Sequence, residues 1–159
     1  MRCKLFGVTN ITIIAIGLSA SVANAGEVLV GPPTVLDSTT MRVQGKMVQL
    51  DFIKSLKPGN ACTWKNRPLD CGMLAAAGLK DLVVGANVTC VQNISGKYTC
   101  TASGYDLAYG LIHAGWAVPT SNAPAQYQIK RARAESHKLG FWAARNTAGH
   151  VVAMQISTH

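Results

Sequence analysis

The segment CGMLAAAGLKDLVV, residues 71–84, is the part of the chain that most constrains the fold. It is rich in alanine and leucine, and its apolar residues recur at the spacing of one helix face. Gly85 follows the last of them and ends the pattern. The segment therefore predicts a helix. The residues at helical spacing are Met73, Leu74, Ala77 and Leu82.

Three short strands are predicted before this helix. Residues 34–36 are apolar and β-branched, whereas residues 41–44 and 47–53 alternate between apolar and polar side chains. A Gly-Lys pair between the second and third strands predicts a turn. Residues 55–68 contain lysine, proline, glycine and asparagine without a period, and we expect them to form a loop.

Two strands and two further helices are predicted after this helix. The strands cover residues 87–92 and 97–102, and an Asn-Ile-Ser-Gly turn joins them. The helices cover residues 106–114 and 123–139, and Gly140 ends the second one.

This order of elements, three strands, a helix, two strands and two helices, predicts a mixed α+β fold. Five strands in a meander interrupted by a helix are typical of a small closed barrel of the OB type. We therefore expect a β-barrel with helices, namely a five-stranded OB-fold barrel with about three helices.

The N-terminus has the pattern of a secretory signal peptide. Arg2 and Lys4 precede an apolar run over residues 11–22, and Ala23-Asn24-Ala25 fits a small-residue cleavage site. A membrane anchor is the alternative, but the apolar run is shorter than the roughly 18–20 residues that span a bilayer. We expect a secreted or periplasmic protein with no transmembrane segment after cleavage.

The chain left after cleavage is long enough for one domain with a hydrophobic core. We expect a signal peptide over residues 1–25, a leader over 26–33, the folded domain over 34–145 and a C-terminal tail over 146–159. The tail shows little pattern after Ala148.

The chain is basic, with a formal charge of +8 at pH 7. Loss of Arg2 and Lys4 with the signal peptide would lower this charge to +6. A basic exported domain indicates an anionic partner, such as a nucleic acid, an acidic polysaccharide or a membrane surface.

Four cysteines follow the predicted signal peptide, and in an exported chain an even number indicates two disulfides. Three pairings are possible. The local pairing, Cys62 with Cys71 and Cys90 with Cys100, closes two loops of about ten residues, each worth roughly 2.5–3 kcal/mol in the chain-entropy model. A zinc site is the alternative, but the spacings are not Cys-x-x-Cys and export favours oxidation.

Several segments together resemble one family of domains in their order and spacing. The strongest is Cys71-Gly72-Met73-Leu74-Ala75-Ala76, followed by Gly115-Trp116-Ala117 and Leu139-Gly140-Phe141-Trp142. They resemble the staphylococcal-nuclease-like, or thermonuclease, domains, and in particular the exported bacterial branch that has Cys-Gly before its first helix. The resemblance covers residues 35–142 and implies an OB-fold domain of the nuclease type.

Active members of this family hold calcium with two aspartates, activate water with a glutamate and hold the scissile phosphate with two arginines. Their motifs are Asp-Gly-Asp-Thr, Arg-Leu-x-Gly-Ile-Asp-x-Pro-Glu and Tyr-Gly-Arg. Aligned with these motifs, the chain keeps the first aspartate as Asp37. The replaced positions are Thr39 and Lys54 for the calcium aspartates, Lys57 for the glutamate, and Gln49 and Lys97 for the arginines. The resemblance therefore implies a degenerate active site with no catalytic residue, no metal and no other cofactor.

The replacements place cations where the family has its metal site. Lys54, Lys57 and Lys97, with Arg42 or Lys46 nearby, would attract anions without a metal. An OB barrel face is a common surface for nucleic acids and sugar polymers. The alternative is that these side chains are solvated loop cations with no ligand.

Other features of the chain carry less chemistry. The basic stretch over residues 130–133 predicts either a solvated helix face or a contact with an acidic polymer. Trp64 lies beside Lys65 in the disulfide loop and is a candidate for ligand contact. Trp116 and Trp142 occupy core positions of the family. The histidines have no spacing typical of a catalytic triad.

Three functions remain open at the level of the sequence. The first is a binding or accessory module for a nucleic acid or another polyanion. The second is an active nuclease with a rearranged site, which would require carboxylates such as Asp37 and Asp51 to converge. The third is a structural interaction protein of the cell envelope.

Overall fold

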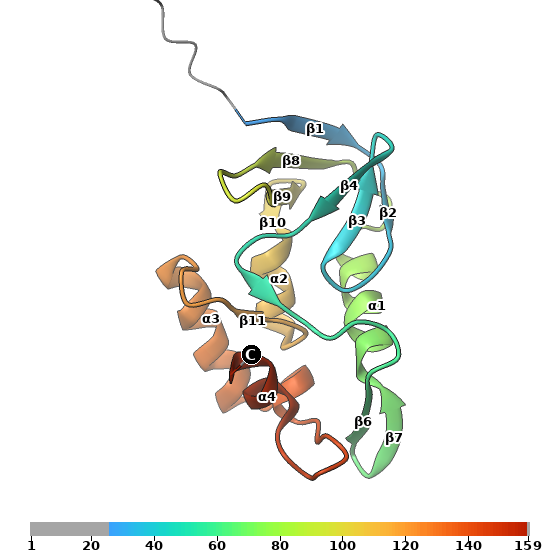
Figure 1. The fold of residues 1–159 in the computed structure, drawn as a ribbon, viewed down its shortest axis with the longest axis vertical. Helices are drawn as coiled ribbons and strands as arrows, with labels where there is room; N and C mark the ends of the chain where they lie inside the picture. The colour runs from blue at the N-terminus through green and yellow to red at the C-terminus, as the bar shows by residue number, and fades with distance from the viewer. Residues whose placement is uncertain (1–25, 159) are drawn as a thin grey trace, which may run out of the picture.

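The computed structural model describes residues 26–158, so the predicted signal peptide lies outside the described residues. Within this range short antiparallel sheets combine with four α-helices, which confirms the α+β class (Figure 1). The strands are β1 (Val28–Gly31), β2 (Pro33–Val35), β3 (Thr40–Val43), β4 (Lys46–Gln49), β5 (Ile53–Lys54), β6 (Ala61–Trp64), β7 (Arg67–Asp70), β8 (Val88–Gln92), β9 (Tyr98–Ala102), β10 (Tyr105–Asp106) and β11 (Val118–Pro119). The helices are α1 (Cys71–Val83), α2 (Leu107–Ala114), α3 (Ala125–Ser136), the short 3-10 helix η1 (Gly140–Trp142) and α4 (Val152–Thr158).

The strands pair into four sheets, and the strands within each sheet are antiparallel. One sheet has the order β1-β8-β9-β10, and a second is the meander β2-β3-β4. Strand β5 pairs with β11, and β6 with β7. A parallel bridge between Leu50 and Tyr98 links the residue after β4 to the start of β9.

The ladders of residues 26–158 form these separate sheets rather than the single closed barrel of five strands that the sequence pattern predicts. The strands are also shorter and more numerous than expected, because the chain bends within them. Pro32 separates β1 from β2, and its nitrogen cannot donate to a ladder. Phe52 has a φ of 64°, in the left-handed region, and it interrupts the strand predicted over residues 47–53.

The predicted helices over residues 71–84 and 106–114 are confirmed, and an aspartate caps each of them. The Asp70 carboxylate accepts a hydrogen bond from the Met73 amide at 2.9 Å, and the Asp106 carboxylate accepts one from the Tyr109 amide at 2.9 Å. Each cap satisfies an amide that has no partner within the helix. The predicted helix over 123–139 is present as the shorter α3.

Three segments that the sequence pattern predicts to be leader, loop or tail contain strands or a helix. The expected leader includes β1, which pairs along β8. The expected loop over residues 55–68 includes β6 and the first two residues of β7, which pair as a hairpin. The expected tail includes α4, whose buried residues Val152, Ala153 and Ile156 pack with Phe141 in one hydrophobic cluster.

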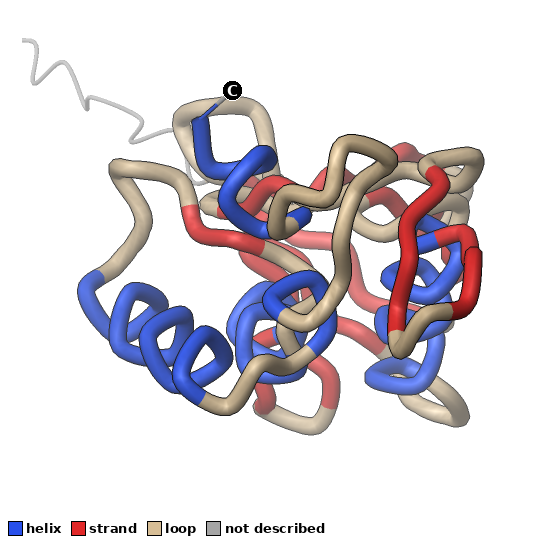
Figure 2. The backbone as a smooth tube through the Cα atoms, turned by 90° about the horizontal axis from the view of Figure 1, so that it is seen from below, coloured by secondary structure: helices blue, strands red, loops and turns tan. Residues whose placement is uncertain are grey.

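The buried residues form two hydrophobic clusters. The first joins the β-strands to α1 and α2, with Leu79, Leu107 and Leu111 among its fully buried side chains. The second joins β6, η1 and α4 at the lower end of Figure 1, around Phe141 and Trp142. Figure 2 shows α3 and the β6–β7 hairpin on opposite sides of the molecule.

Both disulfides of the local pairing are present, so the described cysteines are bridged and do not form a zinc site. The Cys62–Cys71 bridge joins β6 to the first residue of α1, and the Cys90–Cys100 bridge joins facing positions of β8 and β9. Among residues 26–158, no helix has both the length and the apolar character to cross a membrane.

Candidate anion-binding site

A pocket of about 420 Å³ gathers several of the positions aligned with the nuclease motifs. Asp37, Gln49 and Lys57 line it, together with Gly96 from the turn that contains Lys97. The fold thus brings Gly96 next to residues that lie at least 39 positions earlier in the sequence. The complete lining is Leu36, Asp37, Thr40, Met47, Gln49, Lys57, Gly96 and Tyr98.

The Asp37 side of the pocket is a turn held by its own side chains. Asp37 Oδ1 accepts hydrogen bonds from the Thr39 amide at 2.8 Å and from the Thr39 hydroxyl at 3.2 Å. The fully buried Ser38 hydroxyl donates to the Leu56 carbonyl at 2.6 Å and so fastens the turn next to Lys57. Thr39, aligned with a calcium ligand, therefore helps to build the turn.

The backbone of Lys57 is fixed by the start of α1. A Cβ at Gly72 would overlap the Lys57 carbonyl, so only glycine fits at this close approach. The same carbonyl accepts hydrogen bonds from the Asn60 amide at 3.3 Å and from its side chain at 2.7 Å. The Lys57 side chain itself is exposed at the rim of the pocket.

Buried Asp51 positions the turn over residues 93–97. Its Oδ2 accepts hydrogen bonds from Ser95 at 2.7 Å and Asn93 at 2.9 Å, and its Oδ1 accepts one from the Phe52 amide at 2.7 Å. Burial alone would raise the pKa of Asp51, but these hydrogen bonds and the nearby charge of Lys97 hold it below its ordinary value. Asp51 is thus an ionised anchor. In the sequence, Asp51 is one polar position of the strand predicted over residues 47–53, and nothing there marks this role.

The other predicted cations lie outside the pocket. Lys54 is half-buried in β5 and pairs with Val118 of β11. Arg42 is exposed on β3, opposite Met47. The five candidate cations therefore do not form one cluster, and Lys57 alone among them lines the pocket.

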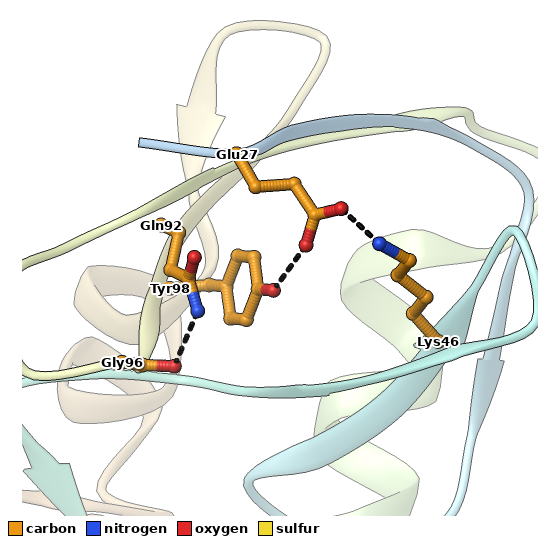
Figure 3. A network of polar contacts seen from close by, with 5 residues as sticks. All are labelled: Glu27, Lys46, Gln92, Gly96 and Tyr98. Atoms are coloured by element: carbon orange, nitrogen blue, oxygen red, sulfur yellow. Dashed lines mark hydrogen bonds and ion pairs between the residues drawn. The ribbon is translucent and has the colours of Figure 1, made fainter. Parts of the chain in front are cut away.

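Lys46 is engaged elsewhere, in an ion pair with Glu27 (Figure 3). The second oxygen of Glu27 accepts a hydrogen bond from the Tyr98 hydroxyl at 3.0 Å. The hydrogen bond from Lys46 and then that from Tyr98 lower the pKa of Glu27, while burial and the bond to Glu27 raise the pKa of Tyr98. This network ties the segment before β1 to β4 and β9.

The side chains of the pocket do not fit a calcium ion. Calcium takes six to eight oxygen ligands, several of them carboxylates. The lining offers one carboxylate, Asp37, one of whose oxygens is already used by Thr39, and it also contains the ammonium of Lys57. Within residues 26–158, no three His, Cys, Asp or Glu residues are placed to hold a metal ion.

The basic stretch of α3 packs against aromatic rings. The Lys130 ammonium lies 5.1 Å from the Tyr109 ring centre, and the Arg131 guanidinium lies 5.4 Å from that of Trp142. Arg131 also pairs with Glu135 at 3.7 Å. Such contacts favour a structural role for this stretch.

The chain matches no protein-family model and no curated protein. The geometry described above is therefore the basis on which a function is inferred.

Proposed function

We propose that the chain is an exported domain of the staphylococcal-nuclease-like type that has lost calcium-dependent cleavage and binds an anionic partner, a nucleic acid or an acidic polymer. The observation that carries this proposal is the pocket whose lining includes Lys57 and a single carboxylate, Asp37. Calcium chemistry needs several carboxylates at such a place, whereas an exposed cation attracts anions.

The strand pairings support an OB-type topology. Strands β1 and β2 lie on either side of Pro32 and pair with β8 and β3, as the two halves of one bent first strand would. The Leu50–Tyr98 bridge continues from the meander to β9 in a parallel sense. Followed in this order, the pairings return to their starting strand, as they do around a small five-stranded barrel.

The chemistry of the aligned positions supports the loss of catalysis. Phosphodiester hydrolysis requires activation of water and neutralisation of the charge that develops in the transition state. The ammonium of Lys57 cannot accept a proton from water, and Gln49 carries no charge. A rearranged site using Asp51 is disfavoured because both of its oxygens accept hydrogen bonds from the protein.

The location outside the cytoplasm is part of the same proposal. Two disulfides fit an oxidising compartment, which for an exported protein is the periplasm or the extracellular space. The formal charge of +6 that remains after loss of Arg2 and Lys4 from the full +8 supports attraction to polyanions in either place.

The binding proposal is tested with fluorescently labelled single-stranded DNA and with polygalacturonate, each titrated at several salt concentrations. We expect binding that weakens with salt, and the double substitution K57Q/K97Q should lower the slope of log affinity against log salt by about 0.7 for each lost contact with DNA. Lys80→Gln, an exposed lysine on α1, is the matched control. An unchanged slope in K57Q/K97Q, or no binding of either polymer, would contradict the proposal.

A further inference from the structure

A second pocket, of about 670 Å³, lies between the β6–β7 hairpin and the crossing of two backbone segments, one after α2 and the other at η1. Its size is within the range of small-molecule sites. No acidic side chain lines it, whereas two tryptophans and three cations do. The lining is Thr63, Trp64, Lys65, Asn66, Ala114, Trp116, Lys138, Leu139, Gly140, Ala143 and Arg145.

The walls of this pocket are held by covalent and backbone bonds. The Cys62–Cys71 bridge fixes β6 to α1. Thr63 and Arg145 exchange two backbone hydrogen bonds, of 2.7 and 2.8 Å, which place Arg145 beside the strand that ends at Trp64. The pocket is therefore formed in the fold before any ligand arrives, and this lowers the entropy cost of binding.

The aromatic wall consists of Trp64 and Trp116, both of which are half-buried. Trp116 packs edge-on against Phe141, with ring centres 5.5 Å apart, and Trp64 packs edge-on against Trp116 at 5.9 Å. The Lys65 ammonium lies 5.5 Å from the Trp64 ring centre. Trp64 thus offers an indole surface whose neighbour is a flexible cation that a ligand can displace.

The three cations of the pocket have no acidic partner within residues 26–158. The ion pairs in that range join Lys46 to Glu27 and Arg131 to Glu135. Lys65, Lys138 and Arg145 are exposed, so their charges are available to a ligand. Like charges around one cavity repel each other, and an anion would relieve this repulsion.

We propose that this pocket binds a nucleotide unit, either a free nucleotide or one unit of a single-stranded nucleic acid. The base packs on Trp64 in the place of the Lys65 ammonium, and the phosphate lies between Lys138 and Arg145. Bases stack on aromatic side chains, and phosphate is bound by arginine and lysine. An acidic sugar would need many acceptors for its hydroxyl groups, and the neutral polar side chains of the lining are Thr63 and Asn66.

This pocket shares no lining residue with the pocket of Asp37 and Lys57. The inference therefore does not rest on the proposed function, and the two sites can be tested separately. One nucleic-acid strand that contacts both pockets would bind more weakly after substitutions at either pocket.

The test is the titration of the oxidised full chain with a labelled thymidine tetranucleotide, followed by anisotropy and by tryptophan fluorescence. We expect Trp64→Leu to weaken binding about tenfold, because base–aromatic stacking is lost. The double substitution K138Q/R145Q should weaken binding and lower its salt dependence, while Lys80→Gln should leave both unchanged. Thermal melting checks that each variant is folded. If Trp64→Leu is unfolded, K138Q/R145Q by itself decides the test.

Two results would overturn the assignment. One is unchanged binding of the tetranucleotide by folded K138Q/R145Q. If K57Q/K97Q loses binding in the same experiment, the strand binds at the pocket of Asp37 and Lys57 and not at the tryptophan-lined pocket. The other is tighter binding of an oligogalacturonate than of the tetranucleotide, which would make the ligand a sugar acid. Loss of binding in K138Q/R145Q with no change in K57Q/K97Q would support this pocket and contradict the proposed function.

Discussion

At position 51 an aspartate with 8 % of its residue surface exposed accepts hydrogen bonds from three protein donors. A buried aspartate stays charged only when hydrogen bonds compensate for the water it has lost. Asp51 meets this condition by anchoring the turn that contains Lys97. Asp37 is the one family carboxylate that the alignment retains, and one of its oxygens likewise accepts hydrogen bonds within its own turn, from Thr39. Asp37 and Asp51 therefore stabilise the turns beside the pocket.

Asp51→Asn is expected to lower the free energy of unfolding by about 1–3 kcal/mol at pH 7, because the amide nitrogen that replaces one carboxylate oxygen cannot accept a hydrogen bond. The pKa of Asp51 is lower in the folded than in the unfolded chain, so its contribution is present above the ordinary aspartate pKa of about 3.9. It is lost as the pH falls through the folded value. Urea unfolding at pH 7 and at pH 3 measures both effects.

The exposed Asp81→Asn is the control for this substitution, and it should change stability little at either pH. An equal stability difference between wild type and Asp51→Asn at both pH values would show that Asp51 is not the ionised anchor described here.

Between elements, the decisive contacts are close approaches of backbone at glycine. Gly72 lets α1 start against the Lys57 carbonyl, and a Cβ at Gly140 would overlap the backbone of Gly115. The amide of Phe141 donates to the Gly115 carbonyl at 2.9 Å across this second crossing. The segment after α2 and the start of η1 thus hold each other and form one side of the tryptophan-lined pocket.

Gly140→Ala should destabilise the fold by about 3 kcal/mol. Its φ of 48° costs an alanine roughly 1–2 kcal/mol, and the overlap with Gly115 adds about 1–3 kcal/mol. Gly149→Ala is the matched control, because Gly149 also has a positive φ, 83°, but has open space at the Cβ position. Thermal or urea unfolding compares the two variants, and an equal loss in both would mean that the crossing at Gly140 is not tight.

In the whole molecule, each disulfide reinforces one connection: Cys62–Cys71 joins β6 to α1, and Cys90–Cys100 joins β8 to β9, which also pair as a ladder. Reduction should lower the free energy of unfolding by about 2.5–3 kcal/mol for each bridge, because each closes a loop of about ten residues. Urea unfolding with and without reductant measures this loss.

In the double variant C62S/C71S, binding of the tetranucleotide should also weaken, since this bridge holds the Trp64 hairpin. The variant C90S/C100S is its control, and equal binding by both would contradict that role.

The sequence predicts the parts of the fold that follow from local patterns. Helix α1 is predicted from the helical spacing of its apolar residues, and the local cysteine pairing is one of the three that the chain allows. Strand β1, the β6–β7 hairpin and α4 are missed because each is short and is stabilised by contacts with distant segments, such as β8 for β1.

The candidate site is predictable in part for the same reason. Motif alignment places Asp37, Gln49 and Lys57 together, as the pocket has them. It cannot tell that Lys46 pairs with Glu27 or that Lys54 lies in another sheet, since these depend on the path of the chain. For the tryptophan-lined pocket, the sequence indicates only Trp64 beside Lys65 as a candidate for ligand contact, because the pocket itself depends on the crossing at Gly140.

The central claim is that this fold binds an anion without cleaving phosphodiester bonds through calcium. The most direct test is incubation of the oxidised chain with single-stranded DNA, with calcium or with chelator, beside Asp37→Asn purified in the same way. We predict no calcium-dependent cleavage by either protein, and salt-dependent binding of the same DNA by both. Calcium-dependent cleavage by the wild type that disappears in Asp37→Asn would contradict the claim and show that the pocket is a working nuclease site.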